Sequence, residues 1–126
     1  MQAAQTFSAS VPQAVATLEA NLGVSGMGAR MDALEILRRV GGRELAAIAG
    51  AIIAARFQRI PVLLDGFVSC AAAAVLHRIE PTALDHCLAA HCSGTEPHAN
   101  LLKKLGKSPL IEVRVTREDG TGAALA

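Results

Sequence analysis

The sequence predicts a layered α/β fold, in which a parallel sheet is flanked by helices. Helical and extended segments alternate along the chain from residue 43 onward, which is the pattern of such layered domains. Residues 62–64 form a short apolar run without alternation, as expected of a buried parallel strand. Hydrophobic residues make up 52% of the 126 residues but aromatic residues only 2%, so the core must be built from small aliphatic side chains. We therefore expect at most one domain, with a single modest core.

The N-terminal part is expected to become helical after a short disordered start. Residues 1–10 are predicted to be disordered, and residues 11–126 are predicted to belong to the α/β domain. Pro12 opens an amphipathic helix, whose apolar residues recur at helical spacing. A linker rich in glycine and serine follows this helix.

Two more helices are predicted before the first strand. Asp32 is a suitable N-cap for a helix that stops at Gly41 and Gly42. The next helix, over residues 43–56, has leucine and isoleucine on one face and alanine over most of the rest. Because a helix that is apolar nearly all round is buried in most folds, we expect this one to lie between other elements.

The remaining elements alternate between strand and helix. Pro61 and the pair Asp65-Gly66 bound the strand at residues 62–64, which we expect to be covered on both faces. The elements predicted after it are a helix over residues 69–79, a strand over residues 87–90, a helix over residues 96–105 that ends at Gly106, and an outer strand or extended connector over residues 109–115.

Composition excludes several classes of function. The formal net charge is +1 and there is no tryptophan or tyrosine, so neither an electrostatic nor a stacking surface for nucleic acid is expected. The longest apolar run covers about 11 residues, 45–55, which is too short to span a bilayer. Three cysteines and the lack of a secretory signal favour a reducing, cytoplasmic location.

The step from Asp65 through Gly66 to Phe67 is the first candidate site. In open parallel sheets, ligands bind beyond the carboxyl ends of the strands. A glycine there lets a ligand approach the main-chain N–H groups. The same glycine also suits a tight turn into the next helix, and spacing alone leaves both interpretations open.

A cluster of histidine and cysteine, His86, Cys87, His91 and Cys92, raises the question of a metal site. Cys87 and His91 share a face, but His86 and His91 do not, so the spacing supplies fewer ligands than zinc needs. There is no C-x-x-C motif either. We expect no metal, and we expect the thiols to be small buried hydrophobic groups.

Two polar loops complete the candidates. Residues 93–98, Ser-Gly-Thr-Glu-Pro-His, precede a helix, where they could cap it or hold an anion on free backbone N–H groups. Glu118 and Asp119 run into the glycine-rich turn at residues 120–122. Acids in such a turn are either solvated or aimed into an apolar pocket as general bases.

The order of these segments resembles one enzyme family. The stretch from VGGRELAAIAG through PVLLDGFVSCAAAAVLHRIEP, then LDHCLAAHCS, LLKKLGKSPL and DGTGAALA, is similar to the C-terminal part of the nicotinate-nucleotide–dimethylbenzimidazole phosphoribosyltransferases. The similarity is continuous over residues 31–126 and weaker from about residue 12. It implies an α/β sheet that is part of a larger doubly wound domain.

The resemblance also implies a reaction. These glycosyltransferases move phosphoribose from nicotinate mononucleotide to 5,6-dimethylbenzimidazole, giving α-ribazole phosphate for the lower ligand of cobalamin, without metal or cofactor. The family's phosphate-binding glycine and serine correspond to Gly66 and Ser93, and its general base corresponds to Asp119. Neighbouring motif positions implied to bind substrate are Asp65, His98, Gly120 and Thr121.

The sequence departs from the family pattern in several respects. The family's base is a glutamate, whereas Asp119 is one methylene shorter and Glu118 takes the place of the preceding glycine. A family lysine that helps to hold the phosphate would lie near Ala14, where the chain has no base. The family's enzymes are also much longer. We therefore expect a homodimer, or a complex with a chain that supplies the missing N-terminal portion; the alternative is a non-catalytic nucleotide-binding or partner subunit that keeps the fold.

Overall fold

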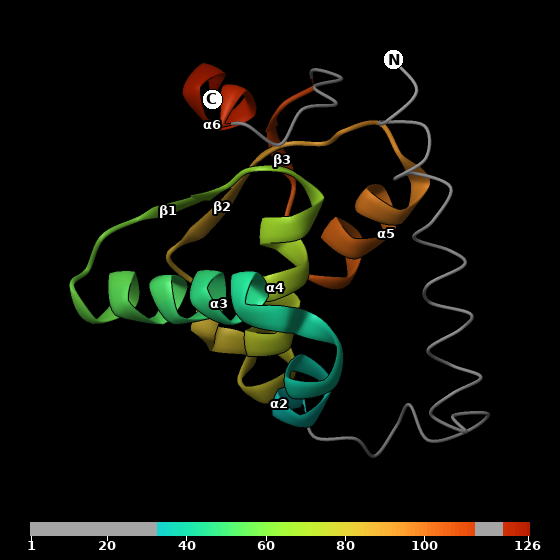
Figure 1. Cartoon of the computed structure of the whole chain (residues 1–126). Helices are drawn as coiled ribbons and strands as arrows, with labels where there is room; N and C mark the ends of the chain where they lie inside the picture. Colours follow the sequence, from blue (N-terminus) through green and yellow to red (C-terminus); the bar gives the residue numbers. More distant parts are fainter. Residues whose placement is uncertain (1–32, 113–119) are drawn as a thin grey trace. The chain divides into compact units, whose positions relative to one another are not determined.

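The computed structural model describes residues 33–112 and 120–126 (Figure 1). The chain divides into two compact units, Met1–Met31 and Asp32–Ala126, and all described residues belong to the second. Residues 1–10, for which disorder was predicted, and the helix predicted from Pro12 both lie outside the described residues.

The described chain contains a parallel sheet of three strands, as predicted. The strands are β1 (Val62–Leu64), β2 (Cys87–His91) and β3 (Pro109–Ile111), in the order β1-β2-β3. Leu64 pairs with Ala89, and Ala89 pairs with Pro109, so the three strands run side by side in one direction. The central strand therefore carries its carboxyl end, His91, to the same edge of the sheet as the carboxyl end of β1.

Helices account for most of the rest. They are α2 (Ala33–Ile36), continued by the π-helical segment η1 (Leu37–Gly41), then α3 (Gly42–Phe57), α4 (Gly66–Ile79), the 3-10 helix η2 (Pro81–Leu84), α5 (Glu96–Lys104) and α6 (Thr121–Leu125). The break predicted at the Gly-Gly pair falls at Gly42, which has a positive φ of 64°. The sequence did not predict the short helices η2 and α6.

The core lies between the inner face of the sheet and the helices α3, α4 and α5. Its strand residues are Leu64, Cys87 and Ala89, all at most 1% exposed. Small side chains on α4 let this helix pack closely against α3, which lies beside it (Figure 1). The other core residues are Ala49, Ile52, Cys70, Ala73, Leu76, Leu84, Leu102 and Leu105. As composition predicted, the core is aliphatic and contains no phenylalanine among the described residues.

Two predictions about burial are wrong. We expected β1 to be covered on both faces, but Leu63, Leu88 and Leu110 are 41%, 47% and 49% exposed on the outer face of the sheet. We also expected the helix over residues 43–56 to be surrounded, yet among the buried residues it contributes only Ala49 and Ile52. The physical reason is the same: in the described part of the chain, helices cover one face of the sheet and α3 packs on α4 from one side.

None of the helices in the described ranges, 33–112 and 120–126, is long and apolar enough to cross a membrane.

Truncation is predicted to destabilise the protein much more on the inner face of β1 than on its outer face. Leu64→Ala should lower the free energy of unfolding by about 2–5 kcal/mol, because it opens a cavity in the core. Leu63→Ala, the matched control on the next residue, should cost about 1 kcal/mol or less, since that side chain is already partly exposed. Urea unfolding followed by circular dichroism measures both; equal losses would contradict the assignment of faces.

Candidate functional site

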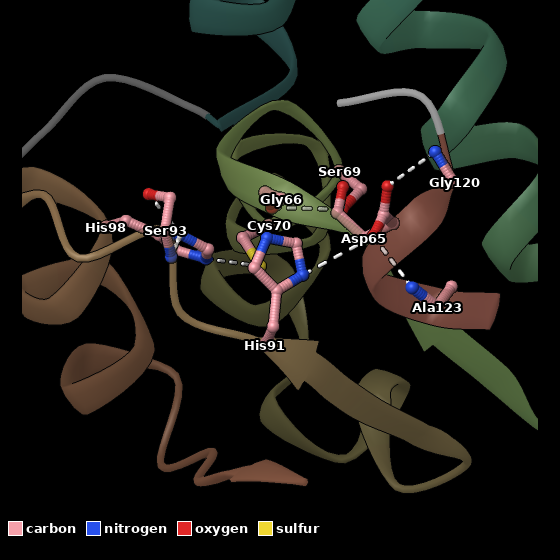
Figure 2. Close-up of polar contacts among 9 residues, drawn as sticks. All are labelled: Asp65, Gly66, Ser69, Cys70, His91, Ser93, His98, Gly120 and Ala123. Atoms are coloured by element: carbon pink, nitrogen blue, oxygen red, sulfur yellow. Dashed lines mark hydrogen bonds and ion pairs between the residues drawn. The ribbon is translucent and has the colours of Figure 1, made fainter. Parts of the chain in front are cut away.

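Three segments meet at the carboxyl end of the sheet (Figure 2). Asp65 directly follows β1, His91 ends β2, and Ser93 follows two residues later. The third segment is the glycine-rich turn that begins α6, which packs against β2. This edge is where open parallel sheets bind ligands, because the loops after the strands leave room there.

The side chain of Asp65 joins β1 to the distant turn. Asp65 occupies the N-cap position of α4, but it makes no side-chain hydrogen bond to that helix. Instead, Oδ2 accepts a hydrogen bond from the N–H of Gly120 and Oδ1 accepts one from the N–H of Ala123, each over 2.9 Å. Gly120 is the N-cap of α6 and Ala123 lies in its first turn, where backbone N–H groups have no partner within the helix. Asp65 therefore caps α6 from 55 residues away.

The turn itself requires glycine at two positions. Gly120 has a φ of 84°, in the left-handed region that disfavours residues with a Cβ. Gly122 is buried, and a Cβ built on it would collide with the imidazole ring of His91 and come within 2.6 Å of Asp65 Oδ1. Glycine is therefore needed at Gly120 for the backbone conformation, and at Gly122 because His91 and Asp65 lie too close for a side chain.

His91 is fully buried at the centre of the site. Its Nδ1 atom lies 3.4 Å from Asp65 Oδ1, and its ring meets that of His98 edge-on, with the centroids 6.1 Å apart. The ring fills the space below the turn that Gly122 leaves open. His91 therefore packs between the capping carboxylate and the loop that follows β2.

His98 fixes the loop that contains Ser93. The N–H of Ser93 donates to His98 Nδ1 over 3.1 Å, so Nδ1 carries no proton and the neutral ring is protonated at Nε2. That Nε2–H group points at Cys70 Sγ, 3.5 Å away. Burial lowers the pKa of His98, and the electrostatic effect of His91 lowers it further. A second proton on this ring would also break the bond from Ser93, which favours the neutral form.

Ser93 presents its hydroxyl beside this buried ring. Its Oγ atom lies 3.0 Å from His98 Nδ1 and 3.0 Å from the Oγ1 atom of Thr95. Ser93 is half-buried: His98 holds it on the protein side, and part of the residue remains accessible to solvent. Ser69 plays a similar part on α4, since its hydroxyl donates to the carbonyl oxygens of Asp65 and Gly66.

Most of the residues predicted for the site lie together in the structure. Asp65 and Gly66 lie at the start of α4, Ser93 and His98 lie around the following loop, and Gly120 and Thr121 begin α6. Gly66 is buried with a φ of 73°, which lets the chain turn from strand into helix. His98 is buried and bonded to the loop, and Thr121 is exposed. Glu118 and Asp119 lie outside the described residues.

His91 and Gly122 belong to this site, although the sequence did not predict a role for either of them here. The sequence pattern raised His91 only as a metal ligand, but its place at the end of a buried strand is a signal for the site. Gly122 belongs to the glycine-rich turn, but only the structure shows which side chain approaches it.

The histidine and cysteine cluster makes other contacts. His86 Nε2 lies 3.0 Å from the backbone carbonyl of Ile52, to which it donates, and Cys87 is buried in the core. Burial raises the pKa of the Cys87 thiol, which keeps it protonated. Over residues 33–112 and 120–126, no three histidine, cysteine or acidic side chains are grouped as a metal site.

Comparison with known proteins identifies close relatives. A family model described as "Phosphoribosyltransferase" matches residues 4–126. A nicotinate-nucleotide–dimethylbenzimidazole phosphoribosyltransferase of Methylocella silvestris is 58% identical over 95 residues, 75% of this chain and 28% of the relative. The enzyme of the same name from Brucella anthropi is 52% identical over 118 residues, 94% of this chain and 32% of the relative.

A solved structure supports the same comparison. The crystal structure of the enzyme of this name from Thermus thermophilus superposes with a TM-score of 0.71 at 38% identity, covering 77% of this chain and 29% of that one. The chain thus spans less than a third of the length of these relatives.

The neutral state of His98 predicts loss of stability in acid. Because its pKa in the folded state lies below the ordinary value of 6.5, the unfolded chain binds the proton more readily. The stability that neutral His98 contributes is complete above pH 6.5 and is lost as the pH falls through the folded-state pKa. The slope contributed by this one proton cannot exceed about 1.4 kcal/mol per pH unit.

Urea unfolding at a series of pH values measures this slope. His98→Asn should flatten it below pH 6.5, because asparagine can still accept from Ser93 but does not titrate. A slope that is identical in the two proteins would contradict the role of His98.

Replacing glycine by alanine is expected to change the free energy of unfolding in opposite directions at Gly122 and at Gly50. Gly122→Ala should lower the free energy of unfolding by about 1–3 kcal/mol, because its methyl group collides with His91 and Asp65. Gly50→Ala lies in the interior of α3 with open space around it, and should raise the free energy of unfolding by about 0.5–1 kcal/mol. Thermal unfolding of both variants tests this; stabilisation by Gly122→Ala would refute the packing described.

Proposed function

The chain belongs to the phosphoribosyltransferase family, and from this premise we propose that it transfers phosphoribose from nicotinate mononucleotide to 5,6-dimethylbenzimidazole. The observation that supports this function most directly is the contact between Asp65 and the turn at residues 120–123. It draws the turn to the end of β1, at the edge of the sheet where ligands of such folds bind.

The proposed reaction is a substitution at the anomeric carbon of the ribose. The unprotonated ring nitrogen of the benzimidazole attacks this carbon, and the bond to the pyridinium nitrogen of nicotinate breaks. The electron pair of that bond leaves with nicotinate, and the configuration inverts to give α-ribazole phosphate. The attacking base gains positive charge as the new bond forms, so its N–H proton must pass to a general base.

We assign the phosphate of the nucleotide to the loops after β1 and β2. Gly66 begins α4, a helix of 14 residues, and the N–H groups of a first helical turn favour an anion. Ser93 adds a hydroxyl on a loop that His98 holds in place. The negative charge of Asp65, next to Gly66, is offset by the two N–H groups that it accepts from α6.

We assign the general base to Asp119, the residue joined to Gly120 by a peptide bond. The family's glutamate corresponds to this position, and Glu118 is the competing candidate. The shorter aspartate would hold its carboxylate farther from the substrate, and a misplacement of about 1 Å can cost about 10²-fold in rate. Activity at a reduced level is therefore part of the proposal.

We further propose that catalysis requires additional protein around this site. The chain covers 28–32% of the length of the two relatives compared above. The leucines exposed on the outer face of the sheet offer an apolar surface to a second copy or to a chain that supplies the rest of the family's length. We also propose a cytoplasmic location, because Cys70, Cys87 and Cys92 are not joined in disulfides.

A series of carboxylate variants tests the reaction and the base. The chain is incubated with nicotinate mononucleotide and 5,6-dimethylbenzimidazole, alone and with a polypeptide that corresponds to the remaining part of a relative. We expect α-ribazole phosphate by chromatography, at least in the second mixture. Asp119→Asn should lower its rate of formation by about 10²-fold, whereas Asp119→Glu should raise it.

Glu118→Gln is the matched control and should change the rate little. A large loss in this variant together with an unaffected Asp119→Asn variant would move the base to Glu118. If the wild-type chain gives no product in either mixture, the proposed transfer is wrong.

A further inference from the structure

We propose that Asp65 is a positioning residue for the turn that carries the base, and that it does not bind the substrate. Its catalytic consequence rests on the proposed function, whereas its structural part stands on the described contacts. The resemblance to the family implies that Asp65, the neighbour of the phosphate-binding Gly66, binds substrate, and the proposal departs from that expectation.

Both carboxylate oxygens of Asp65 are directed to the protein. Oδ2 receives the N–H of Gly120 and Oδ1 receives the N–H of Ala123, at 2.9 Å in each case. Oδ1 also faces the ring of His91, 3.4 Å away, and Gly122 packs close to the same oxygen. Figure 2 shows the carboxylate between the end of β1 and the turn, with His91 on its other side. The side chain is only 16% exposed.

The contact acts at a peptide bond next to the proposed base. The nitrogen of Gly120 is the amide nitrogen through which Asp119 continues the chain. A hydrogen bond that fixes this nitrogen restricts where the preceding residue can place its carboxylate. Two bonds to one carboxylate fix both the distance and the orientation of the turn, as bidentate contacts do elsewhere.

The kinetic parameters kcat and KM distinguish a positioning role of Asp65 from a substrate-binding role. Removing a positioning contact displaces the base in the transition state, which lowers kcat and leaves the KM for nicotinate mononucleotide unchanged. Removing a ligand of the substrate weakens ground-state binding and raises KM. The two roles of Asp65 therefore predict different parameters to change.

The first test needs no activity and uses amide hydrogen exchange in the full chain, followed by NMR. In Asp65→Ala, exchange at Gly120 and Ala123 should speed up by about tenfold or more, because a charged acceptor has been lost from each. In Asp65→Asn, one carbonyl oxygen remains, so at least one of the two amides should exchange more slowly than in Asp65→Ala. If Asp65→Ala does not fold, Asp65→Asn alone tests the proposal. In this variant, the amide of Gly120 or of Ala123 must exchange faster than in the wild type.

A reference amide and a control variant test whether the faster hydrogen exchange is confined to the turn. The amide of Val62, the first residue of β1, donates to the carbonyl of His86 just before β2 and should exchange at an unchanged rate. Asp85→Asn is the matched control, because it makes the same chemical change at an exposed carboxylate and should leave Gly120 and Ala123 unaffected. Unchanged exchange at both turn amides in the Asp65 variants would overturn the proposal.

The second test measures kcat and KM in the mixture in which the wild-type chain is active. Asp65→Asn should lower kcat by about 10-fold to 10²-fold at an unchanged KM for nicotinate mononucleotide. A raised KM at an unchanged kcat would make Asp65 a substrate ligand and overturn the proposal. If the wild-type chain forms no product at all, the proposed function fails and the catalytic consequence fails with it, while hydrogen exchange still decides whether Asp65 holds the turn.

Discussion

The site depends on one carboxylate that accepts two backbone N–H groups. Asp65 follows the strand β1, and its two oxygens bind Gly120 and Ala123 at the start of α6. A helix of five residues has little stability of its own, so its first turn must be held by the rest of the protein. The carboxylate satisfies two otherwise unpaired donors and offers them negative charge, which a helix N-terminus favours. The position of the turn therefore follows from the position of the strand.

Close packing around the contact between Asp65 and the turn restricts which substitutions the site can accept. The buried ring of His91 lies against Asp65 and against Gly122, where no side chain would fit. His91 in turn meets His98, whose Nδ1 atom holds the backbone of Ser93. The loop after β2 and the turn before α6 are thus linked through two imidazole rings. A substitution in the loop after β2 is therefore expected to disturb the turn before α6, and the reverse is expected as well.

Sequence reasoning could predict the local features and the family, but not the contacts between distant segments. The run at residues 62–64 and the segment at residues 87–90 were predicted as strands, because short apolar runs between turn residues are a local signal. The contact of Asp65 with the turn joins residues 55 apart, and no local pattern encodes it. Burial was mispredicted for α3 for a similar reason: an alanine-rich helix looks apolar on every side, and only its neighbours decide which side is covered.

The measurement that tests this account most directly is the scalar coupling transmitted through a hydrogen bond. In the isotope-labelled chain, a coupling between the amide nitrogen of Gly120 and the side-chain carboxyl carbon of Asp65 would show that the two are joined, as the 2.9 Å contact requires. We expect this coupling, and a second one from the amide nitrogen of Ala123 to the same carbon. The absence of both couplings, with the coupling from Val62 to the carbonyl of His86 observed in the same spectrum, would contradict it.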